Sequence, residues 1–491
     1  MNNRVYMDIH ILQTVPPSCI NRDETGSPKT AVYGGVTRAR VSSQAWKKAV
    51  RDMFCGKYGD ALLEKSQLGQ RTKDIIGLVL DQVLEIASKE SRIPGVSEND
   101  LRDKICETIN LASEKAGKPI IPATKLKDIF KSLLDATKEY RDIGDEEGER
   151  SLIEDVIIVA EIALSEDFRA SLDASPTMKK VIDKIKLSCG EEKDDTSHEL
   201  KEKQKELKDR LLESPRISEQ LGMTGDALFF MGMYEAERLA RLVVESIEMG
   251  KAVDKKDVLS AFNRQGMEGQ RHAIDVALFG RMVAKAPAIN ADASCQVAHA
   301  ISTHKVQNEF DFFTGLDDRS KEIGAAMMGT TEFNSSTLYR YATIAVHSLV
   351  KQLGSVEAAV FAVGAFVDAF IRSMPTGKIN TYANQTPPNV VYATIRADQP
   401  LNLVGAFECP IRASDSGYVV PSVAALFEKA KESKKWVKPP IASFVVSGII
   451  CSADDVAQVG VTQKDTIGML IKDLQEVVGA ALTKKAEPIL Q

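Results

Sequence analysis

The sequence predicts an α+β protein in which a domain of mixed strands and helices is interrupted by a long helical insertion. Two observations support this fold class. Alternation typical of strands occurs at residues 4–15 and resumes after residue 270. Between them, roughly residues 61–270 carry helical patterns and charge-rich breaks without any strand pattern. We therefore expect a sheet domain with a helical domain inserted into it.

Composition is that of a globular protein, and length allows two or three domains. The chain has 491 residues, of which 44% are hydrophobic and 27% charged. A net charge of −6 gives no global sign of a nucleic-acid partner. Residues 1–60 differ, because they hold nine Lys and Arg against five Asp and Glu. The N-terminal end is therefore locally positive.

The seven cysteines are scattered, and no two are spaced as a C-x-x-C pair. Isolated thiols are typical of a reducing cytoplasm, and the N-terminus lacks the pattern of a signal peptide. The six histidines are too dispersed to indicate a metal site. We expect a cytoplasmic protein without a membrane span, a metal or another cofactor.

The first element is a strand at residues 4–15. Val5, Met7, Ile9 and Ile11 alternate with more polar residues, which predicts one better-buried face. Within the insertion, helices are expected at 72–90, 98–115, 124–140, 151–164 and 226–248. A run at 198–213 places leucines on one seam and is either a solvated helix or a coiled-coil arm.

Strand patterns resume at 273–282, and residues 303–336 carry little regular period. A strand is expected at 338–350, then a helix from Ser355, as N-cap, to Ile371, ended by Pro375. Further strands are expected at 388–397 and 441–451, with helices at 421–433 and 464–482. Without the insertion, this order of strands and helices is ferredoxin-like.

The segment 16–51 is a loop followed by a basic amphipathic helix. Ser42 and Ser43 are N-cap candidates. Past them, one helical face carries Gln44, Lys47, Lys48 and Arg51, and the other carries Trp46, Ala49, Val50 and Met53. The loop adds Arg22, Lys29, Arg38 and Arg40, with Gly26, Gly34 and Gly35 allowing close backbone approach to a bulky ligand. This pattern suits a polyanion held by its phosphates, and the alternative is a solvated basic helix.

Two blocks of residues carry a family resemblance. The first consists of Pro17-Ser18, Asn21-Arg22-Asp23, Lys29, Gly34-Gly35, Arg40, Ser42-Ser43-Gln44, Lys47 and Arg51. The second, from Asp275 to Ala342, contains DVALFGRM, VAHAISTHKV, DFFTGLDD, GTTEF and LYRYA in order. In both, the sequence resembles the backbone subunits of type I-E CRISPR Cascade, the CasC proteins of the RAMP-type Cas-seven family. The insertion is longer than in that family.

The resemblance implies a modified RNA-recognition-motif palm with a helical fingers insertion and an extended thumb. The expected boundaries are 1–60 for the N-terminal palm, 61–270 for the fingers, 271–302 for a palm strand region, 303–336 for the thumb and 337–491 for the C-terminal palm. The implied partners are a guide CRISPR RNA, target DNA, neighbouring copies of the chain and other Cascade subunits. Copies would polymerise along the guide and present it for pairing with DNA.

The resemblance also implies the contact residues. RNA contacts are expected from Arg22, Lys29, Arg40, Ser42, Gln44, Lys47, Arg51, Met282, Phe312, Phe313 and Thr314, and DNA contacts from Lys255 and Lys256. Aromatic and soft side chains beside a cationic track suit single-stranded nucleic acid. Alternatively, one of the two phenylalanines anchors the thumb to its own core, and the lysine pair is an ordinary helix surface.

No catalytic residue is expected, because H-E-x-x-H, G-x-S-x-G and Walker A patterns are absent. Two other function classes stay open. The first is a metal-dependent endoribonuclease, because relatives in type III complexes cut RNA with an aspartate in the loop after the first strand, where this chain has Asp23. The other is a structural protein whose helical insertion is the functional part.

Overall fold

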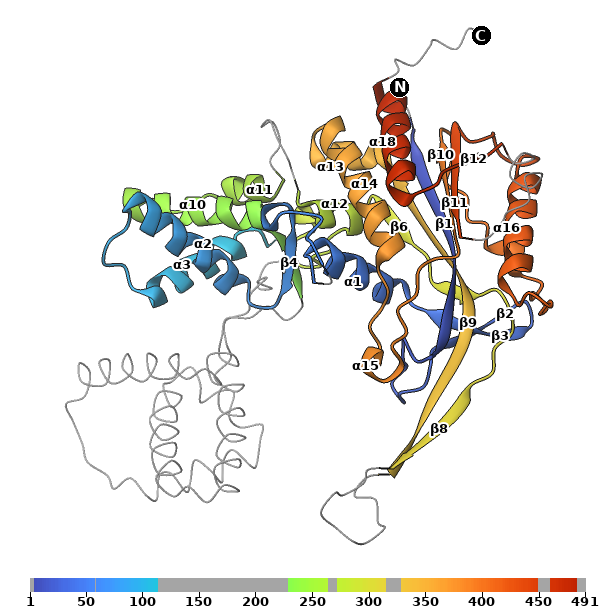
Figure 1. Ribbon diagram of the computed structural model, residues 1–491. Coiled ribbons are helices and arrows are strands. Elements are labelled where there is room, and N and C mark those ends of the chain that lie inside the picture. The colour runs from blue at the N-terminus through green and yellow to red at the C-terminus, as the bar shows by residue number, and fades with distance from the viewer. Residues whose placement is uncertain are drawn as a thin grey trace. The chain divides into compact units, whose positions relative to one another are not determined.

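The computed structural model describes residues 4–57, 59–113, 228–263, 272–314, 328–448 and 460–483 (Figure 1). The chain divides into two compact units. The first unit comprises Met1–Gln70, Phe230–Arg238 and Leu259–Gln491, and the second comprises Arg71–Phe229 and Leu239–Val258. The expected helices at 124–140, 151–164 and 198–213 lie outside the described residues.

The first unit is built on one large sheet. Its strands follow the order β12-β11-β10-β1-β9-β7-β3-β2, while β6 and β8 pair with β9. The pairs are antiparallel except for β11 with β12. The bounds are β1 Tyr6–Ser18, β2 Thr30–Tyr33, β3 Val36–Val41, β6 Cys295–Val297, β7 Ala300–Ser302, β8 Glu309–Thr314, β9 Met328–Ala345, β10 Val390–Arg396, β11 Ala442–Ser447 and β12 Thr462–Gln463.

Helices pack on both faces of this sheet. In Figure 1, α13, α14 and α18 lie on one side of the sheet and α16 on the other. The bounds of the helices in the first unit are α1 Ser43–Phe54, α12 Ile274–Phe279, α13 Val346–Leu353, α14 Val356–Arg372, α15 Ile379–Tyr382, α16 Val419–Ser433 and α18 Ile467–Thr483, with short 3-10 turns at η1 Lys65–Gln67, η2 Pro287–Ile289 and η3 Val404–Phe407.

The second unit contains α2 Ile75–Glu90 and α3 Glu98–Asn110. Both helices begin at a side-chain cap, Asp74 for α2 and Ser97 for α3. Helices α10 Met233–Met249 and α11 Lys255–Asn263 each have residues in both units, and β4 Gly69–Thr72 pairs with β5 Phe229–Gly232. Among the described helices, none has the length and apolar character that crossing a membrane requires.

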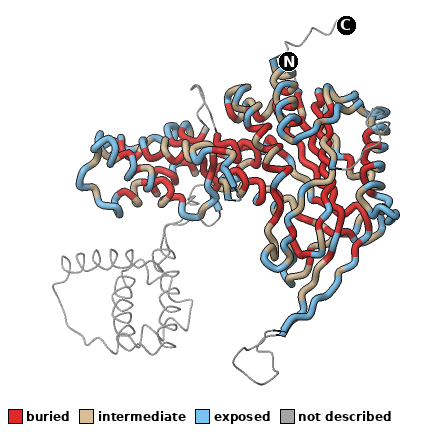
Figure 2. Tube along the Cα trace, in the orientation of Figure 1, coloured by how far each residue is buried: buried red, intermediate tan, exposed pale blue. Residues whose placement is uncertain are grey.

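Strand β1 runs through the centre of the sheet and is buried on both faces (Figure 2). Met7, Ile9 and Ile11 belong to the core under α1, α13, α14 and α18. His10 and Leu12 on the opposite face are at most 2% exposed, because α16 covers that side. The sequence prediction of a single better-buried face was therefore wrong, since it did not anticipate a helix on each side.

Most predicted elements of the sheet domain are confirmed. β1, β10, β11, α14, α16 and α18 lie within a few residues of their predicted ranges. Ser355 is the N-cap of α14, where its hydroxyl accepts from the Ala358 N–H at 2.9 Å. The mixed α+β class with a large sheet is confirmed, and so are the helices expected at 72–90 and 98–115.

Four local predictions were wrong. Where a strand was expected at 273–282, Ile274–Phe279 form helix α12, because all six of its side chains are buried and leave no exposed face to set the period. The strand expected at 338–350 ends at Ala345 and continues as α13. Residues 61–270 include β4 and β5, four residues each and too short to show alternation. Residues 309–314 and 328–336, expected to be irregular, form a β-hairpin arm.

Candidate nucleic-acid interface

The loop after β1 is a compact turn fixed to the start of α1. The Lys29 N–H donates to the Asn21 carbonyl at 2.9 Å, and an isolated bridge joins Arg22 to Pro28. The Asn21 side-chain oxygen accepts from the Ser42 N–H at 2.9 Å. The Arg22 side chain is exposed on this loop. The sequence therefore builds a defined platform beside the N-terminus of α1.

Asp23 closes the turn at the tip of this loop. Its Oδ1 atom accepts from the Thr25 hydroxyl at 2.7 Å and from the Thr25 and Ser27 N–H groups at 3.0 Å each. Hydrogen bonding to Thr25 lowers the pKa of Asp23. Hydrogen bonds to the charged form make a carboxylate a weaker base, so Asp23 is held as a turn acceptor.

Lys29 and Arg40 lie together at the foot of the arm. Both line a small cavity that Asn334 and Ser336 of β9 also line. The Arg40 Nε–H donates to the Thr30 carbonyl at 3.0 Å, and one terminal nitrogen lies 3.2 Å from the Nδ1 atom of His299. Burial and the neighbouring Arg40 and Lys29 charges lower the pKa of His299. This cluster is thus a local concentration of positive charge.

Helix α1 begins as the sequence predicts, with Ser42 as N-cap. The Ser42 hydroxyl accepts from the Ala45 N–H at 3.3 Å, and Trp46, Ala49 and Val50 are among the buried residues of the helix. Gln44 is exposed. The half-buried Lys47 has its ammonium 5.7 Å from the centre of the Phe279 ring.

Of the predicted loop and helix cations, Arg51 engages a buried carboxylate and Arg38 is itself buried. The Arg51 Nε–H lies 3.0 Å from a carboxylate oxygen of Asp275, which is 1% exposed, and a terminal N–H donates to the Gly69 carbonyl. Arg38 is fully buried. Its guanidinium donates to four main-chain carbonyls, those of Tyr33, Ser302, Phe407 and Glu408.

The backbone of Gly34 packs closely against another segment of the same chain. Its φ is +59°, and a Cβ there would lie 1.7 Å from the Glu408 carbonyl oxygen. The glycine is therefore required for packing of the β2–β3 turn against this segment. Sequence reasoning expected such closeness toward a bulky ligand instead.

Met282 is presented on an anchored loop. Its side chain is 84% exposed. The preceding Arg281 is buried, lies 2.6 Å from a Glu235 carboxylate oxygen and donates to the Ile289 carbonyl. The following Val283 N–H donates to the Asn290 side chain at 2.6 Å. Because both flanking residues are anchored, the exposed methionine is available for contact with a flat ligand.

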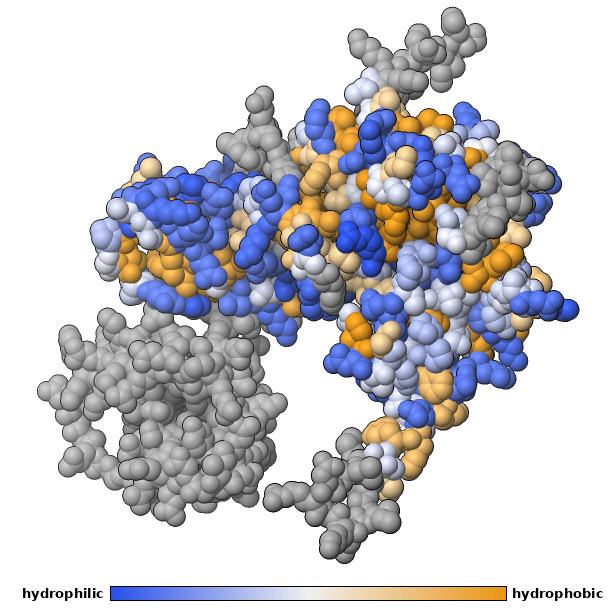
Figure 3. Space-filling view, viewed as in Figure 1, coloured by the Kyte–Doolittle hydropathy of each residue, from blue (hydrophilic) through white to orange (hydrophobic). Residues whose placement is uncertain are grey.

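The arm formed by β8 and β9 carries exposed aromatic side chains. Phe310 and Phe312 are 67% and 65% exposed and alternate in β8, so they share one face with Thr314. Phe313 is on the other face, is 38% exposed, and its ring lies against Gly329, where an added Cβ would be 2.7 Å from it. Figure 3 shows apolar residues along the surface of this arm.

Lys255 and Lys256 begin helix α11 in the second unit. Both are exposed. The Lys255 ammonium donates to the Ser113 carbonyl at 3.1 Å, which closes the end of α3 against α11. Within the described part of the chain, no group of three or more His, Cys, Asp or Glu is arranged to hold a metal ion.

Sequence reasoning missed three residues of this region. Phe310 would have been found from its alternation with Phe312, had residues 309–314 been recognised as a strand. His299 is brought to Arg40 by β7 and its neighbours. Lys378, whose ammonium lies 3.2 Å from the Thr331 hydroxyl of the arm, comes from a loop with no sequence signal of its own.

Comparisons with solved structures find chains of similar fold. A chain in a solved structure titled "CRISPR RNA-guided surveillance complex, pre-nicking" is similar in fold, with a TM-score of 0.63 and 24% identity over 96% of this chain and 100% of that chain. Another, titled "CRISPR RNA-guided surveillance complex", gives a TM-score of 0.48 and 21% identity over 96% of this chain and 99% of that one. No curated protein matches significantly.

The family model named CT1975-like protein (Cas_CT1975) matches residues 7–151 and 160–473. This match includes the basic loop, helix α1, the insertion and the arm. Because it spans well over half of the sequence, the chain belongs to the CT1975-like protein family, which is of the Cas-seven type, and the resemblance read from the sequence is confirmed at the level of that family.

Proposed function

We propose that the chain is the guide-RNA-binding backbone subunit of a type I-E Cascade complex. In this proposal the first unit is a modified RNA-recognition-motif palm, the helical insertion forms the fingers, and the β8–β9 arm is the thumb. Copies polymerise along the guide and present its bases to target DNA. Family membership supports the proposal, and the observation that carries it is a cationic cluster at the foot of an arm with exposed aromatic rings.

The phosphate track consists of exposed or half-exposed cations. Lys29 and Arg40 form its centre, since they converge beside His299. Arg22 lies on the same loop, and Lys47 lies on the first turns of α1. Ser42 accepts from the helix N-terminus, so its hydroxyl hydrogen can still be donated to a phosphate oxygen, and Gln44 can donate from its amide. Arg51 is left out of the track because Asp275 and Gly69 already engage its guanidinium.

The stacking side chains lie on the arm and beside α12. Phe312 and Thr314 share an exposed face with Phe310, which we add to the predicted set. Unstacked guide bases held by an adjacent protomer would cover this face. Met282 offers a second soft surface, while Phe313 is half-covered by Gly329 and has a mixed structural and contact role.

Contacts with target DNA are assigned to Lys255 and Lys256. Lys256 is the stronger candidate, because the Lys255 ammonium is engaged by the Ser113 carbonyl. We propose binding without catalysis. The endoribonuclease alternative would use Asp23, yet its Oδ1 atom is the acceptor of a tight turn and its pKa is lowered, which weakens it as a base.

The test is the salt dependence of binding to fluorescently labelled single-stranded RNA. Four track cations predict that log affinity falls with log salt at a slope of about −3, taking ~0.7 per phosphate. The double variant Lys29→Ala/Arg40→Ala should reduce the slope by about 1.4 for every RNA sequence. The matched control Lys351→Ala/Lys472→Ala removes two exposed lysines from α13 and α18. Equal slopes for both double variants would contradict the track.

A further inference from the structure

An exposed tryptophan lies far from the guide track and the arm. Trp436 is 83% exposed in the segment that joins α16 to β11, here called the Trp436 turn and comprising residues 434–441. At its end, the Ile441 N–H donates to the Ile395 carbonyl. The neighbouring Arg396 pairs with Tyr6 at the start of β1, whereas the basic loop follows Ser18 at its end. A strand of this length spans about 40 Å, so the two surfaces are separate.

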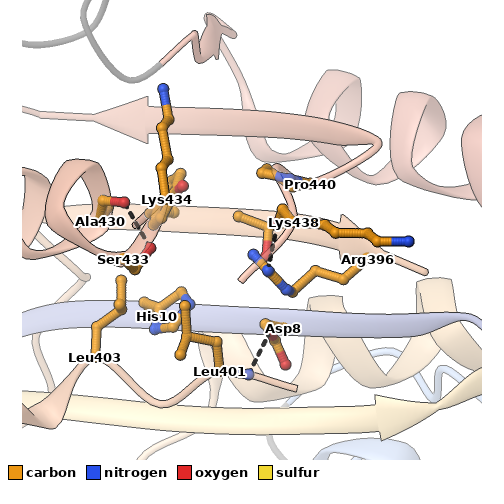
Figure 4. A pocket seen from close by; sticks show the side chains of 12 residues that line it. Asp8, His10, Arg396, Leu401, Leu403, Ala430, Ser433, Lys434, Lys438 and Pro440 are labelled. Atoms are coloured by element: carbon orange, nitrogen blue, oxygen red, sulfur yellow. Dashed lines mark hydrogen bonds between the residues drawn. The ribbon is translucent and has the colours of Figure 1, made fainter. Parts of the chain in front are cut away.

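The Trp436 turn is held in a defined conformation. The Lys438 N–H donates to a carboxylate oxygen of Asp398 at 3.1 Å, and the Lys438 carbonyl accepts from Arg396, which is 3% exposed, at 2.6 Å (Figure 4). At the other end, the Trp436 N–H donates to the Ser433 carbonyl at 2.9 Å. An exposed indole on an anchored turn loses little freedom on binding a ligand.

Trp436 is flanked in the sequence by lysines. Residues 429–441 contain five lysines against one glutamate, Glu432, whose carboxylate is ion-paired with Lys429 at 2.8 Å. The exposed members are Lys431, Lys434, Lys435 and Lys438. Figure 4 shows the Lys434 ammonium pointing away from the buried His10 and Asp8. The surface therefore combines an aromatic plate with several cations.

This chemistry favours nucleic acid over a protein partner. Protein interfaces are enriched in tryptophan but depleted of lysine, so the lysine content of this turn argues against a protein partner. Single-stranded nucleic acid instead needs flat side chains for its bases and cations for its phosphates. The cavity behind the turn, lined by Asp8, His10 and Arg396, has a volume of about 20 Å³. That space suits about one water molecule and excludes a base, so contacts must lie on the surface of the turn.

We propose that the Trp436 turn is a second contact site for single-stranded nucleic acid, with Trp436 stacking on a base and Lys434, Lys435 and Lys438 contacting phosphates. The strand bound there is distinct from the one on the guide track. The proposal does not depend on the guide-RNA assignment, because it uses none of the track residues.

The chain contains two tryptophans, and this makes the site directly observable. Trp46 is fully buried, so Trp436 is the solvent-exposed emitter. Titrating the full-length protein with oligothymidylate at low salt should quench the tryptophan emission saturably. Duplex DNA should quench it far less, because its bases are already stacked. The variant Trp436→Ala should lose the quenching while its melting temperature stays unchanged.

The lysines are tested by the variant Lys435→Ala/Lys438→Ala, followed by the same quenching. We expect weaker binding and a salt slope reduced by about 1.4, whereas Lys351→Ala/Lys472→Ala should match the unaltered protein. Absence of quenching in the unaltered protein would overturn the proposal, as would quenching that persists in Trp436→Ala. An unchanged salt slope in the lysine variant would do the same. A turn that binds only an acidic protein gives the first of these results.

Discussion

Lys48 and Arg51 lie one turn apart on α1 but have different electrostatic surroundings. The Lys48 ammonium is exposed and pairs with Asp52 on the same helix at 2.6 Å. The Arg51 guanidinium pairs with the buried Asp275 carboxylate, which also accepts from the Gly69 N–H at 2.8 Å. A surface pair adds little to stability, whereas an ion pair with a buried partner leaves an uncompensated charge when it is broken.

We therefore predict that Arg51→Ala lowers the free energy of unfolding by about 3 kcal/mol. Lys48→Ala should change it by less than ~0.5 kcal/mol. Urea unfolding of the two variants provides the measurement. Equal stability in Arg51→Ala and Lys48→Ala would show that the Asp275 carboxylate does not need this partner and would return Arg51 to the phosphate track.

Asp8 predicts a pH dependence of stability. Burial raises the pKa of Asp8 from 3.8 to about 6, although the Leu401 N–H and the Tyr341 hydroxyl donate hydrogen bonds to its carboxylate. The folded state therefore binds the proton more tightly than the unfolded state. This contribution to stability is fully present below pH 3.8 and is lost as the pH rises through about 6.

The variant Asp8→Asn isolates this term, because an amide stands in for the protonated acid. Between pH values below 3.8 and above 6, the unaltered protein should lose about 3 kcal/mol of unfolding free energy relative to the variant. Chemical denaturation at several pH values measures the difference. A constant difference across this range would show that Asp8 titrates normally.

At the scale of elements, the aromatic rings of the β8–β9 arm are exposed, whereas those of the core are buried. Phe310 and Phe312 are about two-thirds exposed, whereas Phe407 is fully buried. The double variant Phe310→Ala/Phe312→Ala should leave the melting temperature unchanged and weaken assembly on RNA by ~1–3 kcal/mol per stacked base. Thr330→Ala, on the strand position paired with Phe312, is the matched control.

A core ring behaves differently, since Phe407→Ala should cost ~3–5 kcal/mol in folding. If the double arm variant lost melting temperature as a core variant does, the rings would be anchors of the arm instead of stacking surfaces. Melting and RNA-dependent assembly measured on the same preparations distinguish the two outcomes.

Local sequence patterns predicted elements whose faces differ in polarity and failed where they do not. Ser355 as an N-cap and the apolar run expected as a strand at 441–451 are local signals, and α14 and β11 were found. Helix α12 has six buried residues in a row, so its sequence lacks the helical alternation of apolar and polar residues. The same limit holds at the candidate site. The sequence identified the basic residues of the loop, but long-range packing decides that Arg38 is buried and Arg40 is not.

At the scale of the whole molecule, the first unit carries its two candidate nucleic-acid surfaces at opposite ends of β1. The Lys29–Arg40 cluster and the arm lie near Ser18, and the Trp436 turn lies near Tyr6. A chain with a net charge of −6 therefore concentrates cations locally. Such patches can bind polyanions while the remaining acidic surface limits unspecific association.

The central claim is that copies of this chain assemble along a single-stranded RNA. Native mass spectrometry of the protein with a series of RNAs of increasing length tests it most directly. The proposed function predicts that the number of bound copies rises in regular steps with RNA length, and that Lys29→Ala/Arg40→Ala lowers occupancy at every length. A copy number that is independent of RNA length, or the same assemblies formed without RNA, would contradict it.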